Sequence, residues 1–418
     1  MKPNAARFAP VLPVVLALSS CAPAADDLAD GPPVLENYAE VLRAQYADAI
    51  TGAADLRTAC TPLFSGTPTQ ASLDDARQAW RDSRPAYMQS EYARFYEGPI
   101  DAAFGGDPTM SNYEALLNSW PLDENVIDYV AGPGGSVVAN GIINTPGLAI
   151  EQQLLVDRNG ADGEKNITAG YHAIEFLLWG QDLDPDGPGN RPVADYVTGS
   201  GPDVDRRREY LDVATQLLVD DLTAVRTQWD PDADNYRAEF VAMAPREGLA
   251  LVLLGMGKLA EGELSGQRIH TPFTTKDQEE EHSCFSDNTV ADYANDVRGL
   301  VSAYFGTYTR TDGSTVGDPA HSLSALVHAR NPALDDRLRD ALEDAVIDIE
   351  EWPEVASCHS PALQGACPFD QLILGVDTDP GRMAVQEIIN DLHAIAISLA
   401  EVATTLGIDL SAADFASQ

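Results

Sequence analysis

Residues 170–182 have the sequence GYHAIEFLLWGQD, which is apolar enough to form a buried helix and therefore decides the fold. Ile174 and Leu178 recur at the four-residue spacing of one helix face. His172 and Glu175 are three residues apart, so a helix projects both side chains from one side. An imidazole and a carboxylate among apolar neighbours are costly to desolvate unless a partner satisfies them.

A metal cation is one such partner, because imidazole and carboxylate are ordinary ligands of zinc and iron. The spacing therefore predicts a metal site that includes His172 and Glu175. A buried histidine that is hydrogen-bonded to a glutamate explains the same pair without a metal. The spacing alone leaves both interpretations open.

The N-terminus is typical of an exported lipoprotein. Two basic residues precede the apolar run 11–18, which is too short to span a bilayer, since about 20 residues are needed. The run ends in Leu-Ser-Ser-Cys, which resembles the pattern cut before a cysteine that carries lipid. We therefore expect a signal peptide over 1–20, lipid attachment at Cys21 and a flexible tether over 21–33. A plain secretory signal with an incidental cysteine is the alternative.

The composition is strongly acidic, with 26 Lys and Arg against 66 Asp and Glu and a formal net charge of −40. Loss of the predicted signal peptide removes two basic residues and no acids, which leaves −42. Nucleic acid is excluded as a partner, because phosphate binding relies on basic side chains. The acidity either attracts cations toward a site or solvates a surface suited to high salt, and we favour the second interpretation.

The cysteine count allows disulfides in an oxidising compartment. If Cys21 carries lipid, four cysteines remain. Cys358 and Cys367 flank a loop and are expected to close it as a disulfide. Cys60 with Cys284 would be the second pair, which the sequence cannot establish. A thiolate zinc cluster is not expected, because the chain has no Cys-x-x-Cys pair.

Helical periodicity dominates the chain, and no sustained alternation of apolar and polar residues predicts a sheet, so the expected fold is all-α. Each half has four or so long helices, which predicts two packed domains that resemble four-helix bundles, with long irregular loops. Asp230-Pro231-Asp232 breaks the pattern. We therefore expect an N-terminal helical bundle over 34–230 and a C-terminal helical bundle over 231–418. Outside 170–182, the predicted long helices cover residues 34–60, 72–98, 206–229, 236–264, 287–306, 320–329, 332–350 and 381–406.

Gly-x-His-x-x-Glu followed by Phe-Leu-Leu-Trp-Gly-Gln-Asp closely resembles the signature of the imelysin-like family, bacterial envelope proteins often called iron-regulated or insulin-cleaving. Segments 79–101, 118–122 and 255–289 are similar to the same family, so the resemblance covers most of the mature chain. One departure is Val290, where relatives usually have histidine. The resemblance implies two related helical bundles with the functional site at or near their interface.

These segments contain further candidate site residues. Glu97 and Asp101 are candidate metal ligands at a helix end, where carboxylates can converge on a cation, although acids at such places are mostly solvated. Arg268 is a candidate binding residue whose planar guanidinium either orients a carboxylate or pairs with a surface acid. His282 is a further candidate, although the acids around it indicate an exposed loop. Trp120 is also a candidate, although such aromatic residues are more typical of a core.

Three functions remain open. The first is a lipid-anchored protein of the cell envelope, in the outer membrane, that binds iron (or zinc) and serves metal acquisition with an outer-membrane uptake partner. The second is a metallopeptidase, as the family's older name implies, but zinc hydrolases need three protein ligands, an open water position and a general base. The third is a surface module that binds a small ligand or a protein without metal. We favour the first, and the sequence leaves open whether the chain is an enzyme.

Overall fold

The computed structural model describes residues 28–101, 112–184, 186–355, 359 and 367–416. The predicted signal peptide, Cys21 and most of the tether lie outside these residues. Within them the fold is all-α, which confirms the prediction, and strands form only two short antiparallel hairpins. The hairpin strands are β1 (Val130–Ala131), β2 (Val137–Val138), β3 (Thr307–Thr309) and β4 (Thr315–Gly317).

Helices account for most of the described chain. The α-helices are α1 (Gly31–Phe64), α2 (Gln70–Met88), α3 (Tyr113–Leu117), α4 (Gln152–Arg158), α5 (Gly170–Trp179), α6 (Val204–Thr227), α7 (Tyr236–Val241), α8 (Pro245–Lys258), α9 (His270–Thr275), α10 (Thr289–Phe305), α11 (Leu323–His328), α12 (Pro332–Val355), α13 (Phe369–Leu372), α14 (Pro380–Thr405) and α15 (Ala412–Ala416). A π-helix, η6 (Leu259–Ile269), continues α8, and two short 3-10 turns, η1 (Glu91–Ala93) and η8 (Cys284–Ser286), matter for the site.

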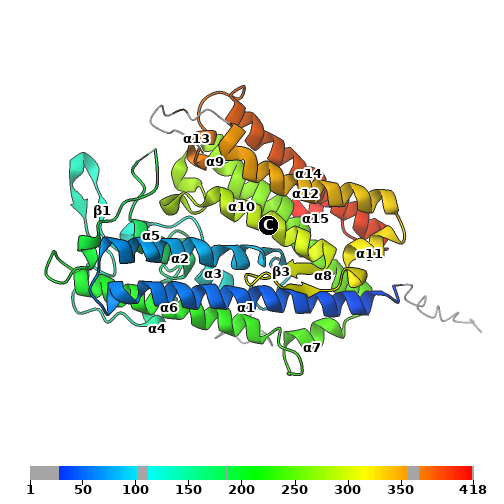
Figure 1. Ribbon diagram of the computed structural model, residues 1–418, viewed down its shortest axis with the longest axis horizontal. Coiled ribbons are helices and arrows are strands. Elements are labelled where there is room, and N and C mark those ends of the chain that lie inside the picture. Colours follow the sequence, from blue (N-terminus) through cyan, green and yellow to red (C-terminus); the bar gives the residue numbers. More distant parts are fainter. Residues whose placement is uncertain (1–27, 102–111, 185, 356–358, 360–366, 417–418) are drawn as a thin grey trace, which may run out of the picture.

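The first layer consists of α1, α2 and α6, which lie side by side along the long axis of the molecule (Figure 1). Helix α2 begins with a capping box in which Thr69 and Ser72 each accept a hydrogen bond from the other's backbone N–H. The sequence places this cap at Ser72, three residues too late. It also extends the helix to about residue 98, whereas α2 ends at Met88 and the chain then turns through η1.

The second layer consists of α10, α12 and α14, with α8 and η6 packed against α14 (Figure 1). Helix α2 contacts α10 and α1 contacts α8, so the two layers are joined directly. Most buried apolar side chains form one continuous core across both layers. The division into two domains at residue 230 therefore stays a prediction. The predicted helix 236–264 is three elements, because Pro245 starts a new helix after the non-helical Ala244.

The cysteines differ from the expectation. Cys60 on α1 and Cys284 in η8 are free and buried, so the second disulfide that the sequence allowed is wrong. Burial raises the pKa of the Cys60 thiol to about 12. Cys367 is disulfide-bonded, and Cys358 lies outside the described residues.

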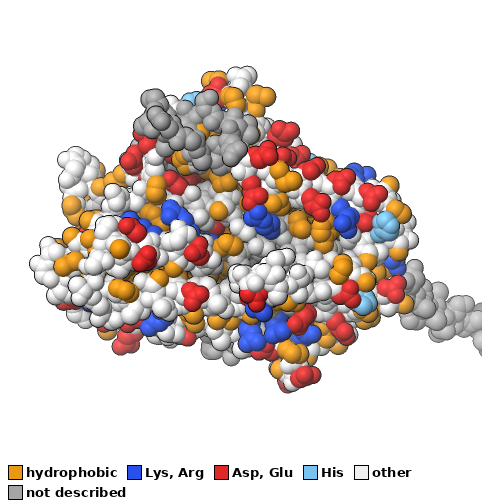
Figure 2. Space-filling view, in the orientation of Figure 1, with side chains coloured by type: hydrophobic (Ala, Val, Ile, Leu, Met, Phe, Trp, Pro, Cys, Tyr) orange, Lys and Arg blue, Asp and Glu red, His pale blue; other side chains and the backbone are white. Residues whose placement is uncertain are grey.

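The surface reflects the acidic composition. Figure 2 shows Asp and Glu side chains spread over the visible face, with fewer Lys and Arg among them. Among the described residues, no helix combines the length and the apolar character that crossing a membrane requires.

Candidate functional site

Helix α5 carries the first part of the site, and a glycine allows it to begin where it does. Gly170 has a φ of +83°, and a Cβ atom on it would stand 2.5 Å from Leu117 O. All ten residues of α5 are buried. His172 Nδ1 lies 2.8 Å from Glu175 Oε2, so the two side chains on this helix contact each other.

A loop from the second half of the chain brings another histidine to α5. The chain turns at Ser283 and Asp287, which have φ values of +65° and +55° on either side of η8. This turn places His282 Nε2 3.1 Å from His172 Nε2. The sequence indicates an exposed loop here, but His282 is buried because η8 packs against α5.

Each imidazole has a carboxylate behind the ring nitrogen that faces away from the other ring. For His172 this is Glu175, whose Oε1 accepts hydrogen bonds from the N–H and hydroxyl groups of Ser286 at 2.9 and 2.7 Å. For His282 it is Asp292, whose Oδ2 lies 3.5 Å from His282 Nδ1. That nitrogen is buried and has no hydrogen-bond partner within the described part of the chain. Such carboxylate–imidazole pairs fix the orientation of a ring.

Asp292 on α10 is itself fixed by residues from three elements. Arg84 of α2 forms a buried ion pair with it at 2.8 Å. The Ser283 hydroxyl donates to the same carboxylate at 2.5 Å, and the Asn288 amide donates at 2.9 Å. A buried charge pair of this kind is stable only when hydrogen bonds satisfy its remaining atoms, as they do here. The ion pair also ties α2 of the first layer to α10 of the second.

Burial controls the ionisation of the group. It lowers the pKa of both His172 and His282 well below the ordinary value, and the nearby guanidinium groups of Arg84 and Arg268 lower it further. The rings are therefore neutral at physiological pH, which is the form that binds metals. Burial also raises the pKa of Glu175 to about 8, although the hydrogen bonds from Ser286 oppose the rise.

Trp120 covers the two imidazoles. The centroid of its ring lies 4.8 Å from that of His172 and 6.4 Å from that of His282. A cavity of about 390 Å³ opens beside Trp120 and His282. Its charged lining residues are Arg94, Glu114, Glu164, Glu263, Arg268 and Glu280. The cavity therefore presents carboxylates next to the histidine pair.

Arg268 binds carboxylates that belong to the protein itself. Its guanidinium contacts Glu91 at 2.5 Å, Asp296 at 2.9 Å and Glu263 at 3.0 Å. Burial alone would raise the pKa of Glu91, but Arg94 and Arg268 beside it hold that pKa at about 2. The sequence left two roles open for Arg268, orienting a carboxylate or pairing with a surface acid. Glu91 and Asp296 are buried, so the structure favours the first role, with carboxylates of the protein itself.

Glu97 and Asp101 do not join the histidine pair. Glu97 is exposed, with a φ of +59°. Asp101 accepts a hydrogen bond from Phe95 N at 2.6 Å and lies 3.8 Å from Arg94 Nε. The structure thus brings together His172, Glu175, His282 and Trp120, and it leaves the other two predicted metal ligands in the turn after η1.

Sequence reasoning missed the residues that fix the site from a distance: Arg84, Ser286 and Asp292. A signal existed for Arg84, which follows Trp80 by four residues on the apolar face of α2. A charged residue on such a face requires a buried partner. Its partner Asp292 is 208 residues away in sequence, so no local pattern identifies it.

Among the described residues, one group of three or more His, Cys, Asp or Glu side chains has ligand atoms close enough to share a metal ion. It consists of His328, the last residue of α11, and of Asp335 and Asp336 near the start of α12. Asp335 accepts hydrogen bonds from Tyr304 at 3.0 Å and Ser324 at 2.7 Å, and it contacts His328 at 3.0 Å. Acids in the first turn of a helix are stabilised by its dipole, which accounts for this group without an ion.

Several known proteins are similar to this chain in sequence or in structure. The chain is 24% identical to iron-regulated protein A of Synechococcus elongatus over 308 residues, which are 72% of this chain and 69% of that protein. A crystal structure of a protein described as a putative iron-regulated protein A precursor, from Parabacteroides distasonis, matches with a TM-score of 0.65 and 21% identity, covering 93% of this chain and 97% of that one.

An imelysin-like protein from Psychrobacter arcticum has a similar structure, with a TM-score of 0.60 and 18% identity, covering 92% of this chain and 98% of that one. Identities this low establish the shared all-α fold alone. The family model described as imelysin, a peptidase family, matches residues 42–399, which is most of the chain. The chain therefore belongs to the imelysin family.

Proposed function

We propose that this chain binds a metal ion, iron in the first place, between the Nε2 atoms of His172 and His282. The observation that carries the proposal is the pair of Nε2 atoms 3.1 Å apart, each on a ring with a carboxylate behind its other nitrogen. Metal-binding histidines in proteins commonly have such a carboxylate at the nitrogen that does not face the ion.

The separation of the two nitrogens suits a shared ion. Bonds of about 2.0–2.1 Å from nitrogen to a metal require the two nitrogens to be roughly 2.9 Å apart at a right angle and roughly 3.3 Å apart at a tetrahedral angle. The Nε2 atoms of His172 and His282 fall between these values. Glu175 would then orient His172 by accepting a hydrogen bond from its Nδ1, rather than bind the ion as the sequence predicts. The positive charge of a bound ion would favour the ionised carboxylate, which burial alone disfavours.

The cavity supports the same proposal. Remaining coordination positions would face the 390 Å³ cavity, where Glu114, Glu263 and Glu280 attract cations. A donor set of imidazole and oxygen suits iron or zinc. The relative in Synechococcus elongatus is named an iron-regulated protein, which favours an iron-related function over zinc.

We further propose that the protein serves metal acquisition in the cell envelope. The support is the sequence: an export signal, a cysteine in a lipoprotein-like context, and a small residue after it that resembles the outer-membrane default. A lipid anchor would hold the protein at the outer membrane, within reach of an uptake partner.

Two other functions make different demands on the same residues. A metallopeptidase needs a third protein ligand and a free general base, and both oxygens of Glu175 already have partners. A module that binds a ligand without metal would use the two imidazoles as a hydrogen-bonded pair and the cavity as its binding site. Metal binding is the function that explains why Glu175 lies behind His172 and Asp292 behind His282.

The test is metal analysis of the lipid-free mature chain, purified from cells grown with and without iron. We expect one metal ion per chain, and at least tenfold weaker binding after His172→Ala or His282→Ala. Glu175→Gln should weaken binding about 10- to 100-fold, because it changes the group that orients the ring.

The matched control is His393→Ala. His393 is exposed and contacts Glu261 at 2.8 Å, so it is a histidine–carboxylate pair outside the site. Its metal content should equal that of the unchanged chain. Full retention of metal in folded His172→Ala, or no binding by the unchanged chain, would refute the proposal. Melting curves from circular dichroism identify variants that are unfolded.

A further inference from the structure

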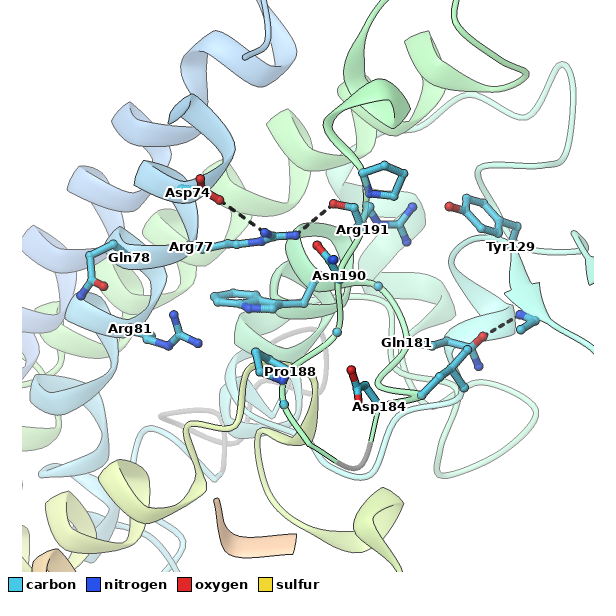
Figure 3. A pocket seen from close by; sticks show the side chains of 17 residues that line it. Asp74, Arg77, Gln78, Arg81, Tyr129, Gln181, Asp184, Pro188, Asn190 and Arg191 are labelled. Carbon is cyan, nitrogen blue, oxygen red and sulfur yellow. Dashed lines mark hydrogen bonds and ion pairs between the residues drawn. The ribbon is translucent and has the colours of Figure 1, made fainter. Parts of the chain in front are cut away.

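A second, larger hollow lies between the first half of α2 and the loop that follows α5, and it shares no lining residue with the 390 Å³ cavity. Its volume is about 960 Å³. Arg77 and Arg81 of α2, Trp179 at the end of α5, and Asn190 in the loop are among the residues that line it (Figure 3). We propose that this groove binds a small molecule through a carboxylate or phosphate oxyanion, with Arg81 as the principal contact.

Arg81 is the lining residue that is available to a ligand. Its Nη2 donates to Ser286 O at 2.7 Å, and this is its one hydrogen bond with the described protein. No carboxylate within the described ranges comes within 4 Å of it. Figure 3 shows its guanidinium directed into the groove without a contact to the other labelled residues. A partly buried guanidinium with unused N–H groups is a strong site for an oxyanion, which it can bind through two parallel hydrogen bonds.

The neighbouring arginines have other tasks. Arg77 donates to Leu178 O and Arg191 O, both at 3.0 Å, and pairs with Asp74. These contacts hold the loop after α5 against α2 and so form a wall of the groove. The Arg191 side chain is held by Asp128 and Asp195.

Two uncharged groups add to the site. The Trp179 ring lies beneath Arg81, with 4.9 Å from the guanidinium carbon to the ring centroid, which fixes the guanidinium by a cation–π contact. The indole N–H of Trp179 and the side-chain amide of Asn190 have no hydrogen-bond acceptor in the part of the chain that the structure covers. Figure 3 shows Asn190 at the groove, so its amide remains as a donor there.

The local charge contrasts with that of the whole chain. Three arginines and two aspartates, Asp74 and Asp184, line the groove, whereas the chain has 66 acidic and 26 basic residues. Arg77 is paired with Asp74 and Arg191 with Asp128 and Asp195, so the positive charge of the described lining that is left for an anion is that of Arg81. Asp184 would exclude the oxyanion from its own side of the groove and so direct it toward Arg81.

The groove is also connected to the histidine pair. Arg81 donates to the carbonyl of Ser286, and Ser286 donates to the Glu175 carboxylate that contacts His172. The oxyanion site and the proposed metal site therefore share one residue. Binding in the groove does not depend on a bound metal, so the two proposals can fail separately.

Calorimetric titration of the lipid-free mature chain tests the proposal, with citrate as the carboxylate probe and inorganic phosphate as the phosphate probe. The buffer is free of metal and contains 0.15 M salt, because screening beyond about 8 Å then limits the general repulsion of anions. We expect saturable binding of one molecule of at least one probe, and the probe that binds identifies the oxyanion. Arg81→Gln should weaken binding at least tenfold.

Arg158→Gln is the matched control, since Arg158 is exposed on α4 and its loss changes the net charge equally. Its affinity should stay within twofold of the unchanged chain. Asn190→Ala, at an exposed side chain, should weaken binding threefold or more and serves if Arg81→Gln does not fold. The proposal is overturned if the unchanged chain binds neither probe, if Arg81→Gln binds equally well, or if Arg158→Gln loses as much affinity.

Discussion

Glu175 and Asp292 each place a carboxylate behind one of the two facing imidazoles, and this arrangement gives the site its order. Glu175 is in turn held by Ser286, and Asp292 by Arg84. The cost of burying the two carboxylates is offset because hydrogen bonds and an ion pair satisfy them, whereas His282 Nδ1 has no hydrogen-bond partner among the described residues. The site is therefore fixed before any ligand arrives, which is what a selective binding site requires.

The sequence could predict only the local half of this arrangement. The spacing of His172 and Glu175 on one helix face is a property of any helix, so it was visible in the sequence. The orientation of the Glu175 carboxylate depends on Ser286, which is 111 residues away in the chain. The sequence therefore could not predict it. His282 and Trp120 were named as candidates through family resemblance, because no local pattern links them to His172.

Asp221 on α6 allows a test of burial at the scale of one residue. Its Oδ2 is buried without a hydrogen-bond partner among the described residues, and burial, with Asp220 nearby, raises its pKa to about 7. Tyr113 of α3 is the other titratable group that faces it. The folded pKa lies above the unfolded value of about 3.9, so stability is lost as the pH rises from about 4 through 7.

Asp221→Asn should therefore stabilise the protein by about 1–3 kcal/mol at pH 8 and change it little at pH 4. Urea denaturation at the two pH values measures both numbers. Asp75→Asn, at an exposed position on α2, is the control and should show no such difference. Equal effects of Asp221→Asn at both pH values would mean that the carboxyl group is not the cause.

At the scale of elements, apolar spacing locates long helices well and their ends poorly. Helices α1, α6, α10 and α14 begin and end within a few residues of the prediction. The predicted helix 236–264 instead divides into α7, α8 and η6. Contacts with other segments also restrict residues within these elements: a Cβ atom on Gly255 of α8 would stand 2.2 Å from Tyr92 O. Contacts between distant segments leave no periodic trace in the sequence.

The start of α5 provides a prediction at this scale. Gly170→Ala combines a φ of +83° with a Cβ atom 2.5 Å from Leu117 O, so α5 and the end of α3 must shift apart. We expect a loss of about 3 kcal/mol or more, since an unfavourable backbone conformation alone costs about 1–3 kcal/mol. Thermal melting and chemical denaturation measure the loss.

Gly160→Ala is the matched control, because Gly160 has a φ of +70° and open space where the Cβ atom would be. It should lose only the conformational part, about 1 kcal/mol. If both variants lost the same stability, the approach of Leu117 would not be what requires glycine at position 170.

At the scale of the whole molecule, the two helical layers meet where the buried charges are. The ion pair of Arg84 with Asp292 joins α2 of the first layer to α10 of the second, and Arg268 of η6 contacts Glu91 in the turn after α2 and Asp296 on α10. Most other acids in the described part of the chain lie on the surface, and the sequence has too few basic residues to pair with them, 26 against 66 acidic ones. The charge was evident from the sequence, but which few acids are buried and paired follows only from the packing.

The unpaired surface acids predict that the stability of the molecule depends on salt. The chain carries a formal net charge of −40, and its self-repulsion is reduced as the screening length falls from about 30 Å at 0.01 M salt to about 3 Å at 1 M. At pH 8, the midpoint of urea denaturation should therefore rise steadily with NaCl. Near pH 4.5, close to the sequence pI of about 4.2, the net charge is small and the same titration should be nearly flat. An equal rise at both pH values would assign the effect to the general action of salt on apolar surface. A rise confined to pH 8 would assign the effect to repulsion between carboxylates. In that case the acidic surface would be an adaptation to a salty medium.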